Sequence, residues 1–376
     1  MYYLIKNAYI CNSVLQQIYY QMDNTTIEQK KNNRVHYLDT LRVLSSFAVI
    51  VLHVSAENFG DYCNSQWVAS NIYDSMTRWC VPVFVMISGA LFLDPKRNVS
   101  YKTIFFKNIF RILTAFIFWS IVYAIYCYIF FKPINAAGLI SEILIGHFHL
   151  WFLYMIIGLY LAVPILRQIA INKDLSMYFM LLSFIFAFCI PHIIDIIELS
   201  PTIKPIGLIL NDIYTTFDFN IAAGFLGYFM LGYYLSNISF SKKTEQIIFI
   251  LGIISFCLIA ILTYSIFNVT HETCKTFYKY ISPLVMLEAV AIFSWIKRNE
   301  IISLKINSFI RKFSKLSFGI YLVHMLVFYT LRSLGINANI INPLFGIPAM
   351  SIAIFIISSI TAYIVSKIPY INKYIL

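Results

Sequence analysis

The chain has 376 residues, of which 60% are hydrophobic and only 12% are charged. Soluble domains carry about 25% charged residues, so this composition excludes a soluble globular class and indicates an integral membrane protein. The formal net charge of +11 calls for no nucleic acid partner, because basic loops of a membrane protein face the anionic lipid of the inner leaflet.

Apolar runs between polar breaks predict an all-α integral membrane protein with about ten transmembrane helices. The runs are 39–57, 79–93, 110–131, 149–166, 176–194, 217–235, 246–267, 278–296, 316–333 and 345–367. The run 79–93 is short for an apolar core about 30 Å thick, and the run 217–235 is loosened by three glycines. Residues 1–37 are expected to form a cytoplasmic N-terminal segment, and residues 38–376 the transmembrane domain.

The distribution of basic residues predicts the orientation. With the N-terminus inside, 21 of the 28 Lys and Arg residues fall in inside segments and six fall outside, and Arg42 lies within the first helix. Both termini are therefore expected in the cytoplasm, with the chain as a multi-pass protein of the inner or plasma membrane. Cys63 and Cys274 fall in expected outside loops, where a bridge between them is conceivable.

The first helix carries the strongest functional pattern. Arg42 and His53 are eleven residues apart, which places them on one helix face about 16 Å apart along the axis. Asp39 lies one turn before Arg42 and Glu57 one turn after His53, so each has a carboxylate at contact spacing. The alternative is a snorkelling arginine and an ordinary interior histidine. Ionisable groups at membrane depth are rare and usually functional, which favours chemistry.

The next two spans add small and basic residues. After an outside loop that holds Asp61 and Asp74, the Ser88-Gly89 pair of the second span permits close helix approach. Lys107 and Arg111 lead into the third span on the inside. Spacing alone leaves two interpretations of this basic group open, anchoring to the inner headgroups and binding of a polyanion.

Further polar residues lie at the ends or within later spans. His147, His149 and Trp151 open the fourth span at the outer interface, where a tryptophan is ordinary but two histidines are not. A zinc site would need a third ligand, and no spacing nominates one. Residues 195–216 are expected to be the longest outside loop, either a cover over an outer pocket or a simple connector.

Two of the last spans contain ionisable groups at depth. Glu288 lies in the eighth span. On the ninth, Ser317, Tyr321 and His324 step by four and three residues and share one face. Such a polar stripe usually faces the interior of the bundle.

Several motifs together resemble a known family. They are Arg42 and His53 on a helix that opens LDTLR, and then FVMISGALFL, KNIFRILTAFIFW, HLWFLYMIIGLYLAVP and SFGIYLVHMLV. In combination, over residues from about Tyr37 to Lys373, they resemble the acyltransferase 3 family of membrane-embedded O-acyltransferases, in particular its surface-polysaccharide O-acetyltransferase branch.

The resemblance implies an enzyme that moves an acyl group, usually acetyl, from cytoplasmic acyl-CoA to a hydroxyl of a glycan or lipid-linked sugar at the outer face. Acetyl-CoA is then the expected donor, with no metal and no nucleic acid partner. The resemblance also implies that Arg42 and His53 form the family's paired motif. Lys107 and Arg111 would form its basic motif on the donor side.

The chemistry of these residue types agrees with that implication. Acyl transfer to a sugar hydroxyl needs a general base, and histidine is suited to this near neutral pH. Arg42 is a fixed positive charge whose distance from His53 favours a clamp on the donor. Glu57 is expected to hold the His53 imidazole by a hydrogen bond.

Two other classes of protein compete with the enzyme. A transporter or flippase for a lipid-linked sugar would also use about ten helices and a few buried charges, but the sequence shows no inverted repeat. A non-catalytic partner in an envelope complex would tolerate replacement of His53.

Overall fold

The computed structural model describes residues 35–60, 62–97, 99–130, 136–217, 224–299, 304–369 and 374–375. Within these ranges all regular structure is helical. Nine helical segments of the described chain are long and apolar enough to cross a membrane. The predicted all-α membrane bundle is therefore confirmed. Most of the expected N-terminal segment, residues 1–34, lies outside the described ranges.

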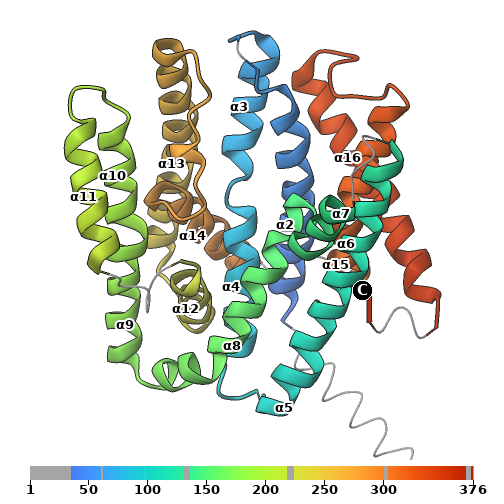
Figure 1. Cartoon of the computed structure of the whole chain (residues 1–376). Coiled ribbons are helices and arrows are strands. Elements are labelled where there is room, and N and C mark those ends of the chain that lie inside the picture. Colours follow the sequence, from blue (N-terminus) through green and yellow to red (C-terminus); the bar gives the residue numbers. More distant parts are fainter. Residues whose placement is uncertain are drawn as a thin grey trace, which may run out of the picture.

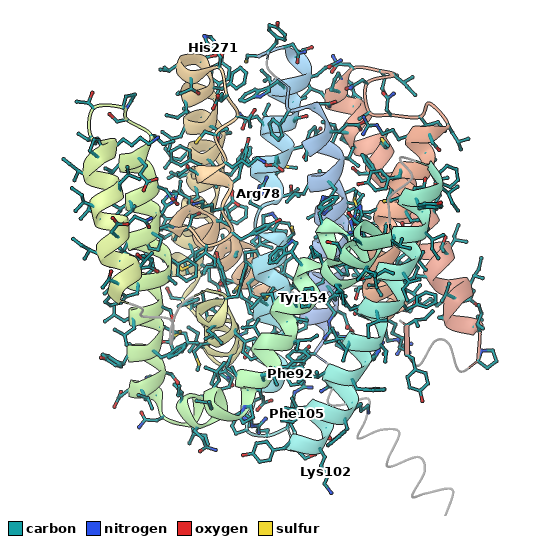
Figure 2. The ribbon with its side chains drawn as sticks, viewed as in Figure 1. Arg78, Phe92, Lys102, Phe105, Tyr154 and His271 are labelled. Atoms are coloured by element: carbon teal, nitrogen blue, oxygen red, sulfur yellow. The ribbon has the colours of Figure 1, made fainter. Side chains whose placement is uncertain are left out.

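The helices run side by side between two ends of the bundle (Figure 1). The end that holds Lys102 is called the lower face and the end that holds His271 the upper face, as Figure 2 displays them. In chain order the elements are α2 (His36–Ser55), η1 (Ala56–Asn58), α3 (Ser65–Thr77), α4 (Cys80–Phe92), α5 (Tyr101–Thr103), η2 (Ile104–Ile109), α6 (Phe110–Phe130), α7 (Ala136–Ile145), η3 (Phe148–Leu150), α8 (Trp151–Ile171), α9 (Lys173–Leu182), η4 (Ser183–Cys189), α10 (Ile190–Glu198), α11 (Lys204–Phe217), α12 (Leu226–Asn237), α13 (Lys242–Thr270), η5 (Thr276–Tyr278), α14 (Pro283–Arg298), α15 (Leu304–Ser333) and α16 (Pro343–Lys367).

Helix α2 lies at the centre of the bundle. It packs against α3, α4, α14, α15 and α16. In its most apolar stretch 67% of the residues are buried, against 22% for α13, which therefore presents most of its surface to lipid. A polar face on α2 thus points into protein, as expected for ionisable groups at membrane depth.

Helices α4 and α12 approach each other at backbone distance. A Cβ atom on Gly89 would overlap the carbonyl oxygen of Phe229, and one on Gly232 would overlap the carbonyl of Met86. The close approach expected at Ser88-Gly89 is confirmed for Gly89, because only glycine leaves room for the neighbouring backbone.

The second span is longer than predicted, because α3 and α4 together cross as Ser65–Phe92. Its first half contains polar residues that suggest an outside loop in the sequence. The side chain of Asn64 caps the start of α3 by accepting a hydrogen bond from the backbone N of Trp67 at 2.8 Å. Asp74 and Arg78, expected in the loop and counted as outside charges, therefore lie inside the bundle, where they pair with each other.

The expected outside loop 195–216 is mostly helical, which corrects the prediction. Helix α10 extends to Glu198 and α11 begins at Lys204. The prolines suggest a loop in the sequence, but Pro205 lies in the first turn of α11, where the missing N–H has no cost. Pro191 lies inside the continuous helical segment Lys173–Glu198, directly after the π-helical turn η4, a place where the α-helical hydrogen bonds are already interrupted. Helices α10 and α11 pack against each other, side by side in Figure 1.

The sixth expected span, 217–235, is not one continuous helix in the described chain. Helix α11 ends at Phe217, α12 covers Leu226–Asn237, and residues 218–223 lie outside the described ranges. Neither helix is among the nine segments that are long enough to span alone. The three glycines of the sequence already indicate a weak point in this run.

Hydrogen bonds hold the turns at the upper face, and no disulfide joins Cys63 to Cys274. Cys63 and Cys274 are both free thiols. Instead the indole Nε1 of Trp67 donates to Thr273 Oγ1 at 3.1 Å, and the amide of Asn71 donates to the carbonyl of Ala260 at 2.9 Å. These bonds tie α3 to α13 and to the segment that follows α13.

Candidate active site

A cavity of about 350 Å³ lies beside α2, and we call it the central cavity. Arg42 and His53 both line it, so the shared face predicted from their spacing is confirmed. Its other walls come from η2, α4, α6, η3, α8, α15 and the segment before α14. Among the predicted candidates it also contains Ser88, Arg111, His149, Trp151 and Tyr321.

Arg42 is oriented by Asp39, as its spacing predicted. The distance from Arg42 Nη1 to Asp39 Oδ1 is 3.5 Å. Asp39 is buried and also accepts a hydrogen bond from Ser314 Oγ of α15 at 2.6 Å. The Arg42 side chain keeps 30% of its surface exposed, so a carboxylate fixed by a second helix holds the guanidinium at the cavity wall.

A basic cavity of about 450 Å³ adjoins the central cavity, and we call it the lower cavity. Lys107, Arg111 and Lys315 line it, and the central cavity shares Arg111, Lys315 and Phe318 with it. The Arg111 guanidinium lies 5.7 Å from the centroid of the Phe318 ring. Three cations from η2, α6 and α15 therefore surround the passage between the two cavities.

Four histidines gather at the other end of the central cavity. The ring of His324 lies 5.3 Å from that of His53 and 5.2 Å from that of His149, measured between centroids. The Nδ1 atoms of His147 and His149 are 2.7 Å apart. The sequence indicated each of these histidines, His53, His147, His149 and His324, but no spacing connected the three segments that carry them. No three His, Cys, Asp or Glu side chains in the described ranges converge with metal-ligand geometry.

Tyrosines hold the histidine cluster in place. Tyr321 donates its hydroxyl to the carbonyl of His149 at 2.6 Å, and the hydroxyl of Tyr329 lies 3.2 Å from His147 Nε2. Tyr123 stacks on His147 with centroids 4.6 Å apart. Tyr321 and Ser317 line the central cavity and His324 is buried, so the stripe predicted on the ninth span does face the interior.

Glu57 is placed differently from the expectation. Helix α2 ends at Ser55 and a 3₁₀ turn, η1, follows it. This tighter turn changes the direction of the side chain relative to a continued α-helix. Glu57 Oε1 pairs with Arg332 Nε at 2.9 Å, and in the described chain no hydrogen bond joins Glu57 to His53.

Glu288 lies outside the central cavity. It is 4% exposed and lines a separate, largely apolar cavity of about 370 Å³ between α2, α3, α13 and α14. Within the described ranges neither carboxylate oxygen has a hydrogen-bond partner. The site that contains His53 therefore does not include this predicted candidate.

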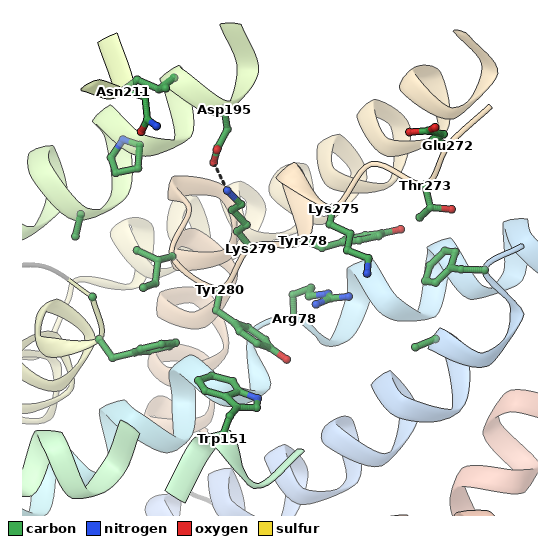
Figure 3. A pocket seen from close by; sticks show the side chains of 18 of the residues that line it. Arg78, Trp151, Asp195, Asn211, Glu272, Thr273, Lys275, Tyr278, Lys279 and Tyr280 are labelled. Atoms are coloured by element: carbon green, nitrogen blue, oxygen red, sulfur yellow. Dashed lines mark hydrogen bonds and ion pairs between the residues drawn. The ribbon is translucent and has the colours of Figure 1, made fainter. Parts of the chain in front are cut away.

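A larger cavity of about 1090 Å³, the upper cavity, lies beyond the histidine end (Figure 3). Trp151 and Tyr280 line both this cavity and the central one. Their rings stack with centroids 5.8 Å apart at an angle of 24°. These two rings therefore form the shared wall. Asp195, Asn211 and Tyr214 show that the α10–α11 pair covers the upper cavity.

Arg78 is the main site residue that the sequence did not reveal. Its Nε donates to Asp74 Oδ2 at 2.9 Å, and its guanidinium lies 4.5 Å from the centroid of Tyr278. Figure 3 shows it beside Tyr280 in the wall of the upper cavity. The helical cap at Asn64 and the spacing of four between Asp74 and Arg78 were the available signals.

Comparison with known proteins agrees with this architecture. A family model described as an acyltransferase domain matches residues 35–364. The chain belongs to the acyltransferase 3 family. No curated protein and no solved structure matches this acyltransferase. The matched residues include all three cavities except Tyr374 and Ser366 of the lower one. The protein is therefore a membrane acyltransferase. Its donor and acceptor are proposed below from the geometry of the cavities.

Proposed function

We propose that the acyltransferase moves an acyl group, specifically acetyl, from acyl-CoA at the lower face to a hydroxyl of a surface glycan or lipid-linked sugar at the upper face. The observation that carries this proposal is the order of the cavities. The central cavity, which contains His53, shares walls with a basic cavity on one side and with an aromatic cavity on the other. Two different substrates can thus approach one base from opposite faces.

The lower cavity suits the phosphates of CoA. Arg111 offers a guanidinium for bidentate contact with phosphate, and Lys107 and Lys315 add point charges. From there an extended pantetheine arm can pass Arg42 and reach His53, because these residues lie about 16 Å apart along α2. Arg42 then clamps the donor chain and leaves the reacting carbonyl near His53.

At the upper end His53 acts as the general base. It takes the proton of the acceptor hydroxyl while the oxygen attacks the thioester carbon. The C–S bond then breaks, and the sulfur leaves with the proton that His53 held, which gives the ester and free CoA. A rival sequence of steps, in which His53 itself carries the acyl group, predicts stable label on the protein when acceptor is absent.

The upper cavity suits a sugar with a charged linkage. Trp151, Tyr278 and Tyr280 offer aromatic surface, and Arg78 offers a fixed positive charge. Clustered aromatic and cationic side chains of this kind suit a sugar that carries phosphate, as a lipid-linked sugar does.

Purified protein with radiolabelled acetyl-CoA and a lipid-linked sugar fraction tests the proposal. We expect label to appear as an ester on the sugar with wild-type protein and not with His53→Ala. Movement of unlabelled sugar across reconstituted vesicles without ester formation would instead identify a flippase. If no label reaches the sugar and no sugar crosses the vesicle membrane, with wild-type amounts of folded protein, the result would support an assembly partner.

The same proposal places the lower face, and with it both termini, in the cytoplasm of the inner or plasma membrane. Cys63 is exposed in the turn before α3, and Lys243 lies in the first turn of α13 at the opposite face. In single-cysteine variants of intact cells, an impermeant thiol reagent should label Cys63. It should not label Lys243→Cys, and the reverse pattern would invert the orientation.

A further inference from the structure

His324 has a fixed proton arrangement. Its Nδ1 lies 2.6 Å from the backbone carbonyl oxygen of Tyr321. A carbonyl oxygen only accepts hydrogen bonds, so Nδ1 carries the hydrogen of the neutral ring. The other nitrogen, Nε2, is therefore an acceptor.

That acceptor lies unused beside His53. His324 is 1% exposed, and its Nε2 has no hydrogen-bond partner among the described residues. The ring centroids of His324 and His53 are 5.3 Å apart. This separation leaves room for an N···N hydrogen bond of about 3 Å once the His53 ring turns its edge toward His324.

In the described chain no hydrogen bond joins a carboxylate to His53. Asp39 is bound to Arg42 and Ser314, and Glu57 pairs with Arg332 through Oε1, while its buried Oε2 has no partner there. A general-base histidine normally needs a partner for its second nitrogen, which fixes the tautomer and stabilises the imidazolium. Here the nearest partner of that kind is another histidine.

We propose that His324 is the positioning residue of His53, an inference that rests on the proposed function. Its Nε2 accepts a hydrogen bond from one N–H of His53 and leaves the other His53 nitrogen unprotonated toward the acceptor hydroxyl. When His53 takes the hydroxyl proton, the same bond stabilises the imidazolium. The proton then leaves with the CoA sulfur, so His324 gains and loses none.

The surrounding contacts keep His324 in this orientation. The backbone carbonyl of Tyr321 accepts from His324, while the hydroxyl of the same tyrosine donates to the backbone of His149. The ring of His149 packs edge-on against His324 at 5.2 Å. The His324 ring therefore cannot turn away from His53 without breaking its hydrogen bond to the Tyr321 carbonyl and its edge-on contact with His149.

The test compares His324→Ala with His324→Gln in purified protein, with radiolabelled acetyl-CoA and a lipid-linked sugar fraction. Glutamine can still present an oxygen acceptor, whereas alanine cannot. For alanine we expect kcat to fall about 10²–10³-fold with KM for acetyl-CoA unchanged. Glutamine should stay within about tenfold of wild type, and added imidazole should raise the rate of the alanine variant.

His192 provides the matched control. It is also buried, at 6% exposed, and its Nδ1 likewise has no partner in the described chain, but it lines none of the three cavities of the site. His192→Ala should keep the wild-type kcat and show no response to imidazole.

The outcomes separate this inference from the proposed function. If wild-type protein transfers no label, the proposed function itself fails. If wild-type protein is active and His324→Ala matches it, the positioning role is overturned. Equal losses in alanine and glutamine variants, without imidazole rescue and with acetyl-CoA binding intact, would also overturn it, because packing alone explains that result. If alanine prevents folding, a folded glutamine variant as inactive as His53→Ala overturns the positioning role in the same way.

Discussion

The lower and upper cavities present positive charge in different ways. In the lower cavity the Lys107 and Arg111 side chains are exposed. In the upper cavity the Arg78 side chain is 15% exposed and is fixed by a fully buried carboxylate, Asp74. Under the proposed function, the lower cavity would receive the multiply charged donor at exposed cations. The upper cavity would orient the acceptor on a surface fixed by the Asp74–Arg78 pair.

Removal of the base between the cavities should have the largest effect. His53→Ala is expected to lower transfer by about 10²–10⁴-fold, because a general base typically contributes that factor. Binding of acetyl-CoA, measured by equilibrium dialysis, should stay at the wild-type level, since the phosphate site that we propose is the lower cavity. Loss of binding together with activity would show that His53 shapes the donor site.

Disruption of the buried pair should destabilise the protein strongly. Asp74→Asn leaves Arg78 as an uncompensated buried charge, for which about 3–5 kcal/mol of stability is usually lost. The thermal midpoint in detergent should fall by many degrees.

The exposed pair Lys279–Asp195 is the matched control for this stability measurement. Its Lys279 side chain is 53% exposed, so Lys279→Ala should change the stability by no more than about 1 kcal/mol. Similar losses in Asp74→Asn and Lys279→Ala would mean that Arg78 is hydrated, and the contrast between the cavities would disappear.

Removal of an exposed positive charge from the lower cavity should weaken donor binding without a loss of stability. Arg111→Ala is expected to raise the Kd for acetyl-CoA about tenfold, with a larger rise when Lys107→Ala is added. The rise should shrink at high salt, because exposed charges are screened.

Lys242→Ala is the control for the donor-binding measurement, since Lys242 is exposed at the start of α13 and lines none of the cavities. An unchanged Kd in the Lys107 and Arg111 double variant would return these residues to membrane anchoring.

The smallest effect on transfer is expected for a change where α4 meets α12, which acts on stability instead. Gly89→Ala forces the two backbones apart, and such overpacking usually costs about 1–3 kcal/mol. Transfer by the protein that remains folded should be reduced only slightly, as measured by label per mole of monodisperse protein. A wild-type thermal midpoint would show that the helices can separate freely here.

Features that depend on one helix could be predicted from the sequence. The shared face of Arg42 and His53 follows from the α-helical repeat alone, and so does the contact between Asp39 and Arg42. Glu57 was misplaced because the same repeat was extended past Ser55, where the helix ends.

Features that depend on several helices could not be predicted in this way. The histidine cluster combines α2, the segment from His147 to His149, and α15, and no local pattern reports how these pack. Arg78 could not be identified from the sequence for a related reason. Its polar neighbours on α3 are paired inside the bundle, whereas in sequence they have the composition of a loop.

The row of three cavities has a consequence for the membrane itself. A passage that links both faces would let ions dissipate the membrane potential, which stores about 2.3 kcal/mol per elementary charge for each 100 mV. Side chains that belong to two cavities at once lie at each boundary of the row, Arg111 and Phe318 at one end and the stacked Trp151 and Tyr280 rings at the other. The cations around the lower boundary, Lys107, Arg111 and Lys315, would also repel metal cations there. Under the proposed function, these boundaries must let substrates in from both sides while the bundle still acts as an electrical insulator.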